Sequence, residues 1–353
     1  MQQKLIGRAT TLAAATMATA ASCGASSSPS FSTYQQRISS LAASIQPRVL
    51  VSSRGSGNHG ESGSADFYTI DHTSLPLALR DMPSSFPRAS TSTSNDHECT
   101  TTTSPSKPLE RVDLELGPSR LAFYIDDVLT HDEADALAAC AEAILEQNGH
   151  SRFAPGIHTP PGMRVNEAAH WYPTATSSSS TSSSSSSSSL FLGPILDRVQ
   201  HLVPQELGGM PLHPRLSEKV AQFKYLPGDR FNRHVDGLFP GQGANEEGTG
   251  VIEWKGVVSG MSMLFYLNDG PNDGLKGGET RLWSSNGKDH VDVTPRKGRV
   301  LFFRRGSPDA VLHAGMPVMA GDREGEEGGG TPKYMALINL AYGNQTGTRP
   351  MMP

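Results

Sequence analysis

The segment FNRHVDG, residues 231–237, places a histidine and an aspartate two positions apart. In a β-strand, residues i and i+2 project from the same face, so His234 and Asp236 would offer an imidazole nitrogen and a carboxylate oxygen side by side. Such a pair can ligate a metal ion. His-x-Asp also occurs often by chance, so the pair alone is weak evidence for a metal site.

A third candidate ligand, His313, lies in the apolar run AVLHAGMPV, 77 residues after Asp236. Two histidines and one carboxylate on one face of a metal leave the opposite face open, which is typical of non-haem Fe(II) enzymes that bind a co-substrate and dioxygen. Catalytic zinc more often takes three histidines. A lone histidine is more often structural, so the hypothesis depends on all three side chains converging.

The candidate ligands lie in a part of the chain that predicts β-structure. From Lys219 onward, short runs rich in β-branched and aromatic residues alternate with Gly, Pro, Asn and Asp, and this spacing predicts a sandwich or barrel. The runs are KVAQFKYL, VVSGMSMLFYLN, ETRLW, HVDV, GRVLFFRR and KYMALINLAY.

Upstream of these runs, the pattern predicts one strand and two helices. The strand lies within residues 121–130. The first helix follows Thr130, which with Glu133 fits a capping box, and closes at Gly149. The second helix is predicted over residues 190–207, with a break at Pro194.

Residues 219–342 resemble the Fe(II)/2-oxoglutarate-dependent dioxygenases, in the prolyl 4-hydroxylase-like branch. The resemblance is carried, in chain order, by QFKYLPGDRFNRHVDG, MSMLFYLND, GGETRLW, GRVLFFRR and LHAGMPV, and upstream by LAFYIDDVLTHDEADAL and RVNEAAHWYP. It implies an α+β, mainly β fold: a double-stranded β-helix, or jelly roll, with flanking N-terminal helices.

The same resemblance implies a reaction and its cofactors. Fe(II) would be held by His234, Asp236 and His313, with 2-oxoglutarate as co-substrate and ascorbate as reductant. The reaction would hydroxylate an unactivated C–H bond of a peptidyl proline or another protein side chain, releasing succinate and carbon dioxide. Three alternatives stay open: a small-molecule hydroxylase of the same fold, a non-catalytic jelly-roll binding module, and a cupin-like zinc or manganese enzyme.

A cation is expected to bind the distal carboxylate of 2-oxoglutarate. Lys333 begins the strand-like run KYMALINLAY, and it is favoured over Arg323, which lies ten residues after His313 beside the glycine-rich stretch EGEEGGG. Tyr225 and Tyr266 occupy aromatic positions that the family often places near the co-substrate.

Three further positions bear on this pocket. Thr280 is expected near it. Leu337 and Asn339 stand where many relatives have an arginine and an aspartate. The segments 237–256 and 269–278 are expected to frame the entrance, because function commonly sits on loops carried by a rigid scaffold.

Composition limits the class of protein and its partners. The 353 residues include 30 basic and 35 acidic side chains, for a net charge of -5, which does not suggest nucleic-acid binding. No apolar run approaches the roughly 18 residues of a membrane span. The three cysteines form no CxxC pair and indicate neither a disulfide framework nor a zinc site. Nothing in the composition predicts an oligomeric state.

The low-complexity segments predict the domain organisation. Residues 1–110 are rich in Ser and Thr and are expected to be disordered, and residues 112–345 are expected to form the catalytic domain, with 219–342 as its core and the poly-Ser loop 174–189 as an insertion. The first 60 residues contain no Asp or Glu. This favours an organelle transit peptide over a secretory route or a cytoplasmic location.

Overall fold

The computed structural model describes most of the chain from residue 31 onward. The described ranges are 31–50, 67–85, 108–150, 162–174, 190–245, 247–321, 330–344 and the backbone of 348–350. In this part of the chain, none of the helices combines the length and the apolar character that crossing a bilayer requires.

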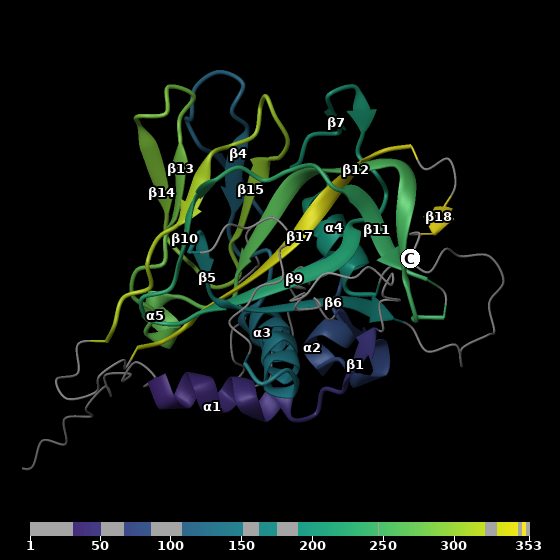
Figure 1. Ribbon diagram of the computed structural model, residues 1–353, viewed down its shortest axis with the longest axis vertical. Coiled ribbons are helices and arrows are strands. Elements are labelled where there is room, and N and C mark those ends of the chain that lie inside the picture. The colour runs from purple at the N-terminus through teal and green to yellow at the C-terminus, as the bar shows by residue number, and fades with distance from the viewer. Residues whose placement is uncertain are drawn as a thin grey trace, which may run out of the picture.

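Two facing antiparallel sheets form the centre of the fold (Figure 1). The central strands of the larger sheet are, in spatial order, β9 (Ser217–Tyr225), β17 (Lys333–Gly343), β12 (Val251–Tyr266) and β15 (Val300–Arg304). The smaller sheet runs β14 (His290–Val293), β13 (Thr280–Trp283), β16 (His313–Gly315) and β10 (Arg230–His234). Because the chain passes repeatedly from one sheet to the other, these eight strands form the expected double-stranded β-helix.

Additional strands widen both sheets. Beyond β9 the larger sheet adds β6 (Glu167–Thr174), β2 (Phe67–Asp71) and β1 (Pro47–Leu50), and beyond β15 it adds β4 (Ala122–Ile125) and β3 (Arg111–Asp113). β11 (Pro240–Ala244) and β18 (Thr348–Pro350) both pair with β12. β5 (Arg164–Val165) pairs with β10, and β7 (Glu206–Leu207) forms a hairpin with β8 (Met210–Pro211).

The central strands of the larger sheet are buried on both faces, which explains their nearly continuous apolar runs. Met263 and Phe265 of β12 belong to the core beneath the helices, whereas Leu264 and Tyr266 belong to the core between the two sheets. This alternation is the period of two that a strand imposes on its side chains. One face of each central strand therefore packs against the helices, and the other face points into the space between the two sheets.

Helices cover the outer face of the larger sheet (Figure 1). They are α1 (Phe31–Ala42), α2 (Leu77–Arg80), α3 (His131–Gln147) and α4 (Leu192–Val199), while the short α5 (Gly270–Asp273) and the 3-10 turn η1 (His72–Ser74) lie in connections. The predicted capping box of α3 is present: Thr130 Oγ1 accepts from the Glu133 amide at 3.2 Å, and Glu133 Oε2 accepts from the Thr130 amide at 2.8 Å.

The expectation of disorder across residues 1–110 was wrong for the described parts of that region. Tyr34 and Ile38 of α1 are buried against the domain, and Arg37 pairs with Asp135 at 3.0 Å and with Asp273 at 3.1 Å. β1 and β2 extend the larger sheet through β6. Local composition missed this order because the stabilising partners lie far along the chain. Residues 1–30, which include most of the proposed transit peptide, and the poly-Ser residues 175–189 lie outside the described residues.

The predicted helix 190–207 is shorter than expected. α4 ends at Val199, and residues 206–211 form the β7–β8 hairpin. Pro194 does not break the helix, because it is the third residue of α4, where its missing N–H leaves no intrahelical hydrogen bond unmade.

A buried ion pair joins α3 to the larger sheet and allows a test of this packing. Lys224 Nζ lies 2.9 and 3.0 Å from the two carboxylate oxygens of Glu142, and Tyr334 Oη donates to the same carboxylate at 2.9 Å. Replacing Glu142 by Ala leaves a buried ammonium without its main partner, so we expect a loss of about 3 kcal/mol in the free energy of unfolding.

Urea denaturation followed by circular dichroism measures this loss. Glu146→Ala, on an exposed position of the same helix, is the matched control and should change stability by less than about 0.5 kcal/mol. Equal destabilisation by the two substitutions would contradict the structural role of the Glu142 pair.

Candidate metal centre

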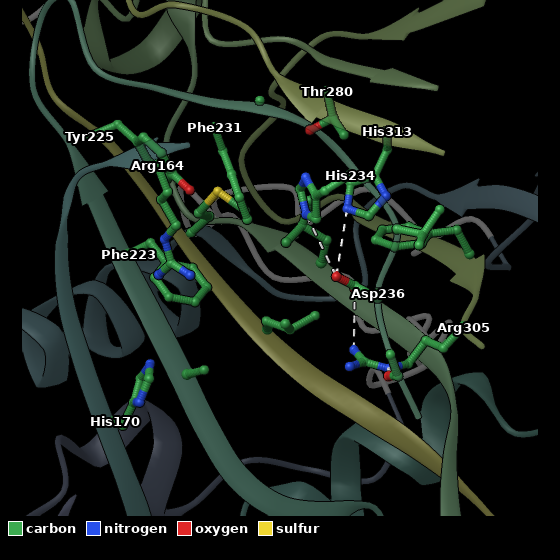
Figure 2. A pocket seen from close by; sticks show the side chains of 18 of the residues that line it. Arg164, His170, Phe223, Tyr225, Phe231, His234, Asp236, Thr280, Arg305 and His313 are labelled. Carbon is green, nitrogen blue, oxygen red and sulfur yellow. Dashed lines mark hydrogen bonds and ion pairs between the residues drawn. The ribbon is translucent and has the colours of Figure 1, made fainter. Parts of the chain in front are cut away.

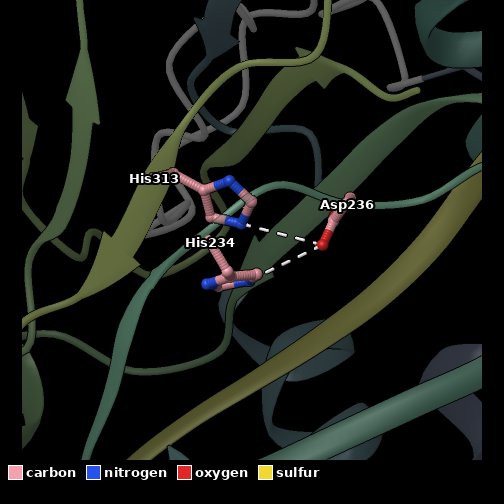
Figure 3. Close-up of side chains that lie close together, drawn as sticks. All are labelled: His234, Asp236 and His313. Atoms are coloured by element: carbon pink, nitrogen blue, oxygen red, sulfur yellow. Dashed lines mark ion pairs between the residues drawn. The ribbon is translucent and has the colours of Figure 1, made fainter. Parts of the chain in front are cut away.

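Strands β10 and β16 bring the two predicted histidine ligands together. His234, the last residue of β10, is the register partner of His313, the first residue of β16. Asp236 follows two residues later, beyond the end of β10. Its Oδ1 lies 3.6 Å from His234 Nε2 and 3.8 Å from His313 Nε2 (Figure 3). The three potential ligand atoms all lie within 4.8 Å of one another, so the predicted triad converges.

Backbone carbonyl groups orient both imidazoles toward this point. Nδ1 of His234 donates to the Asn232 carbonyl at 2.8 Å, and Nδ1 of His313 donates to the Val311 carbonyl at 3.0 Å. A carbonyl oxygen only accepts, so each Nδ1 carries the proton and each Nε2 presents a lone pair to the centre. Metal-binding histidines are typically oriented in this way.

Two further side chains hold the Asp236 carboxylate. Oδ2 accepts from Ser262 Oγ at 2.6 Å and lies 3.2 Å from Arg305 Nη1 (Figure 2), which leaves Oδ1 facing the imidazoles. Burial alone would raise the pKa of Asp236, but the charge of Arg305 and the two histidines hold it below its usual value. The carboxylate is therefore ionised at neutral pH.

The protonation states also suit a metal ion. Burial, reinforced by the neighbouring His313, lowers the pKa of His234 to about 4, so its ring is neutral near pH 7. A metal ligand must be in this form to donate its lone pair. Two imidazole nitrogens and one carboxylate oxygen fit Fe(II) with open coordination positions.

The triad lies in a cavity of about 550 Å³ between the two sheets. Its walls are inward-facing residues at alternate positions of the strands: Lys219, Ala221, Phe223 and Tyr225 of β9, and Lys333, Met335 and Leu337 of β17. The smaller sheet contributes Phe231, Thr280 and Gly315 beside the two histidines. The period of two that buries both faces of the larger sheet thus also lines this space.

The predicted 2-oxoglutarate residues gather at one end of the cavity. Lys333 is buried, and its Nζ donates to the Gly278 carbonyl at 2.6 Å. It lies 5.7 Å from the ring centre of Tyr225 and 5.3 Å from that of Tyr266. Tyr266 lies behind the cavity wall and donates its hydroxyl proton to Thr280 Oγ1 at 2.7 Å. The alternative cation Arg323 lies outside the described residues.

Sequence reasoning missed the side chains that support Asp236. Arg305 follows β15, and its guanidinium also donates to the Gly237 carbonyl at 3.0 Å and to Asn339 Oδ1 at 2.9 Å. Leu337 lines the cavity. An arginine from the end of β15, rather than one from β17, therefore lies beside the metal ligands. The double arginine in GRVLFFRR was the available signal.

The expected entrance loops are only partly confirmed. Gly237 and Phe239 line the cavity, but most of residues 240–256 form β11 and the start of β12. No residue of 269–278 is among those that line the described cavity. His290 does not line this cavity and is exposed on β14.

Residues 220–335 match the model of the 2OG-Fe(II) oxygenase superfamily, and this range contains the whole converging triad. The match assigns this part of the chain, about a third of its length, to that superfamily. The match, together with the triad that it contains, identifies a 2-oxoglutarate-dependent dioxygenase, and the family implies Fe(II) and 2-oxoglutarate as cofactors. The comparison with curated proteins found no match to the oxygenase.

Solved structures similar to the oxygenase include three prolyl hydroxylases, each 18% identical to it. A viral collagen prolyl hydroxylase from Paramecium bursaria chlorella virus 1 matches over 63% of this chain and 96% of its own, with a TM-score of 0.36. A Pseudomonas putida prolyl 4-hydroxylase matches over 64% and 92%, with a TM-score of 0.38.

The third structure is a Trichoplax adhaerens prolyl hydroxylase in complex with a peptide fragment of the hypoxia inducible factor oxygen degradation domain. It matches over 63% of this chain and 83% of its own, with a TM-score of 0.38. The fold of the oxygenase is assigned from its strand topology and from the family model rather than from these three likenesses.

Removal of one histidine tests the metal centre. His313→Ala deletes one of three ligands, so we expect the affinity for Fe(II) to fall by more than about 100-fold. This is a larger loss than usually follows from replacing a residue that only supports a ligand. Anaerobic titration with Fe(II), followed by elemental analysis after desalting, measures this loss.

His290→Ala is the matched control, because this histidine is exposed on the same sheet. It should retain Fe(II) as the unmodified protein does. Full iron occupancy in a folded His313→Ala protein would exclude the triad as the metal site.

Proposed function

We propose that the oxygenase hydroxylates a side chain of a peptide substrate, in the first instance a proline, as a member of the prolyl 4-hydroxylase-like branch. The observation that carries the proposal is the convergence of His234, Asp236 and His313 inside the cavity between the sheets. Bound Fe(II) and 2-oxoglutarate would supply the chemistry: substrate C–H, dioxygen and 2-oxoglutarate would give C–OH, succinate and carbon dioxide. Ascorbate is proposed as the reductant.

The protein's own contribution is ligation, orientation and exclusion of water. His234, Asp236 and His313 would hold the metal, while Ser262 and Arg305 keep the carboxylate oriented. The aromatic and aliphatic walls of the cavity exclude water from the reacting groups. No protein general base is required for this chemistry.

Lys333 is the proposed partner of the distal carboxylate of 2-oxoglutarate. Its ammonium group lies 5.7 Å from the ring centre of Tyr225, and both Tyr225 and Thr280 line the same cavity. The hydrogen bond that Tyr266 donates to Thr280 fixes the Thr280 hydroxyl, so Tyr266 would act indirectly. A buried ammonium in a cavity that also contains these two hydroxyl-bearing side chains suits one carboxylate.

The mouth of the cavity favours a peptide over a small molecule. Val235, Leu238 and Phe239 follow the metal ligands and are 46%, 51% and 53% exposed. Val235 and Phe239 also line the cavity. Exposed apolar side chains beside a functional pocket are typical of surfaces that bind another chain.

An organelle location is proposed from the acid-poor N-terminal composition. Because α1 packs on the domain through Tyr34, Arg37 and Ile38, any removable transit peptide would end before Phe31.

Activity is tested with purified protein, Fe(II), ascorbate, 2-oxoglutarate and peptides that contain a single proline. We expect stoichiometric succinate and a mass gain of one oxygen on the peptide. Lys333→Ala should raise the KM for 2-oxoglutarate by about 100-fold, because the distal carboxylate loses its charged partner. Succinate without any modified peptide would contradict the peptide substrate, and unchanged KM in the variant would contradict the role of Lys333.

The pH dependence of 2-oxoglutarate binding tests the same lysine. Burial lowers the pKa of Lys333 to about 7, an effect that Glu279 partly opposes, while Tyr225 and Tyr266 face the group from β9 and β12. Below this pH the ammonium is present, and above it the lysine must take up a proton to bind a carboxylate. The affinity should therefore fall by about tenfold per pH unit above pH 7.

Anaerobic calorimetry at saturating Fe(II), in buffers with different ionisation enthalpies, measures both the affinity and the proton uptake. Lys333→Arg stays charged at every pH and should remove this slope. An affinity that stays constant from about pH 6 to 9 in the unmodified protein, with no proton uptake, would contradict the assignment.

A further inference from the structure

The cavity contains more positive charge than its metal site and co-substrate require. Its lining includes four basic side chains, Arg164, Lys219, Arg305 and Lys333, against a single acid, Asp236. Arg305 pairs with Asp236, and Lys333 is assigned to 2-oxoglutarate. Among the described residues, neither Arg164 nor Lys219 has an acidic partner within ion-pair distance. The protein as a whole is acidic, so this surplus is local.

Of the two unpaired cations, Lys219 lies away from Lys333. On β9, Lys219 and Tyr225 share the inner face but are six residues apart, which is about 20 Å along a strand. Tyr225 is the register partner of Lys333. A molecule of 2-oxoglutarate held between the metal and Lys333 therefore leaves Lys219 free.

Arg164 and His170 lie on the side of the triad opposite Arg305 in Figure 2, with Arg164 beside Tyr225 and Phe223. The Arg164 guanidinium stacks over the Phe223 ring at 4.0 Å, and its Nε donates to Asn166 Oδ1 at 2.5 Å. His170, on β6, is the register partner of Ala221. Lys219 Nζ lies 4.9 Å from the ring centre of Phe67.

Two polar atoms of this group are buried without a hydrogen-bond partner among the described residues. They are Nη2 of Arg164 and Nε2 of His170. Such atoms are uncommon in folded proteins, because the lost hydration is normally replaced by a hydrogen bond. Burial, together with the charges of Arg305 and Arg164, also lowers the pKa of Lys219 to about 8. Buried cationic groups with unused hydrogen-bonding capacity indicate a site that binds an anion.

We propose that Arg164, Lys219 and His170 form a cationic subsite that binds a carboxylate side chain of the peptide substrate. The inference rests on the proposed function and deepens it: the preferred substrate carries an acidic residue near the residue that is hydroxylated. A guanidinium and an ammonium between aromatic faces suit a carboxylate, because charge-assisted hydrogen bonds strengthen where water is excluded.

The test uses peptides that contain a single proline and a single glutamate, with the glutamate placed at successive positions on either side of the proline. Each peptide is compared with a partner peptide that has glutamine in place of the glutamate. At the best position, kcat/KM for the glutamate peptide should exceed that of its glutamine partner by about tenfold. Lys219→Met should reduce this preference to about twofold or less. Lys219→Glu should reverse it in favour of a peptide that carries lysine at the same position, a result that a purely structural lysine would not produce.

Lys255→Met is the matched control, because Lys255 is exposed on β12 and does not line the cavity. This variant should keep the full preference for the glutamate peptide. Equal kcat/KM for glutamate and glutamine peptides, or an unchanged preference in Lys219→Met, would overturn the subsite. A stronger preference for a phosphoserine partner peptide would overturn the choice of a carboxylate.

Two further measurements separate this inference from the proposed function. Calorimetry with 2-oxoglutarate should give the same affinity for Lys219→Met as for the unmodified protein, since Lys219 is assigned no role there. If no peptide is hydroxylated, the proposed function fails, and the subsite is then judged by fluorescence anisotropy of labelled peptides. Equal binding of the glutamate and glutamine peptides in that assay would overturn the subsite as well.

Discussion

The buried carboxylate of Asp236 is the constraint on which the centre of the oxygenase depends. An unpaired carboxylate in an apolar cavity is strongly unfavourable, so its surroundings must supply charge and hydrogen bonds. Arg305 and Ser262 do so on one oxygen, and the other faces two imidazoles. Arg305 is itself held by Gly237 and Asn339. The metal centre thus depends on side chains from both sheets, and it is intact only when both sheets are assembled.

The two sheets contribute different groups to the cavity. The smaller sheet delivers both histidines from neighbouring strands, and the larger sheet supplies a long inner wall. On β9 that wall carries Lys219 at one end and Tyr225, beside Lys333, at the other. A single strand therefore connects the proposed co-substrate end with the proposed subsite for the substrate carboxylate. The two histidine ligands face this wall from the opposite sheet.

The helical layer explains why the folded unit begins well before the family match. α1 and α3 bury apolar side chains against the outer face of the larger sheet, and charged groups within this layer are paired: Lys224 with Glu142, and Lys297 with Asp135 at 2.5 Å. Arg37 of α1 joins the second of these pairs. Because these contacts join residues far apart in the chain, the N-terminal segment is part of the same folded unit as the oxygenase core.

Residue types and their spacing were sufficient to predict a sandwich or barrel of short strands, the capped helix α3 and the three side chains that converge, while the family resemblance implied the jelly roll. These features are local patterns, or a short ordered series of them: the period of two in β12 and β17, the Thr130–Glu133 box, and His-x-Asp followed by a distant histidine. The position of Lys333 at a strand start was also visible. Each single motif depends on neighbours within a few residues, whereas the link between His313 and the His-x-Asp pair came from the order of motifs along the chain.

The order of α1, β1 and β2, the support of Asp236 by Arg305, and the second cationic end of the cavity were settled by tertiary structure alone. Arg164, His170 and Lys219 lie on three different strands, and no spacing in the chain indicates that they share one space. Their proximity follows from the pairing of β6 with β9 and of β5 with β10. Such long-range pairing depends on the total apolar area that the assembled sheets bury, which no local segment encodes.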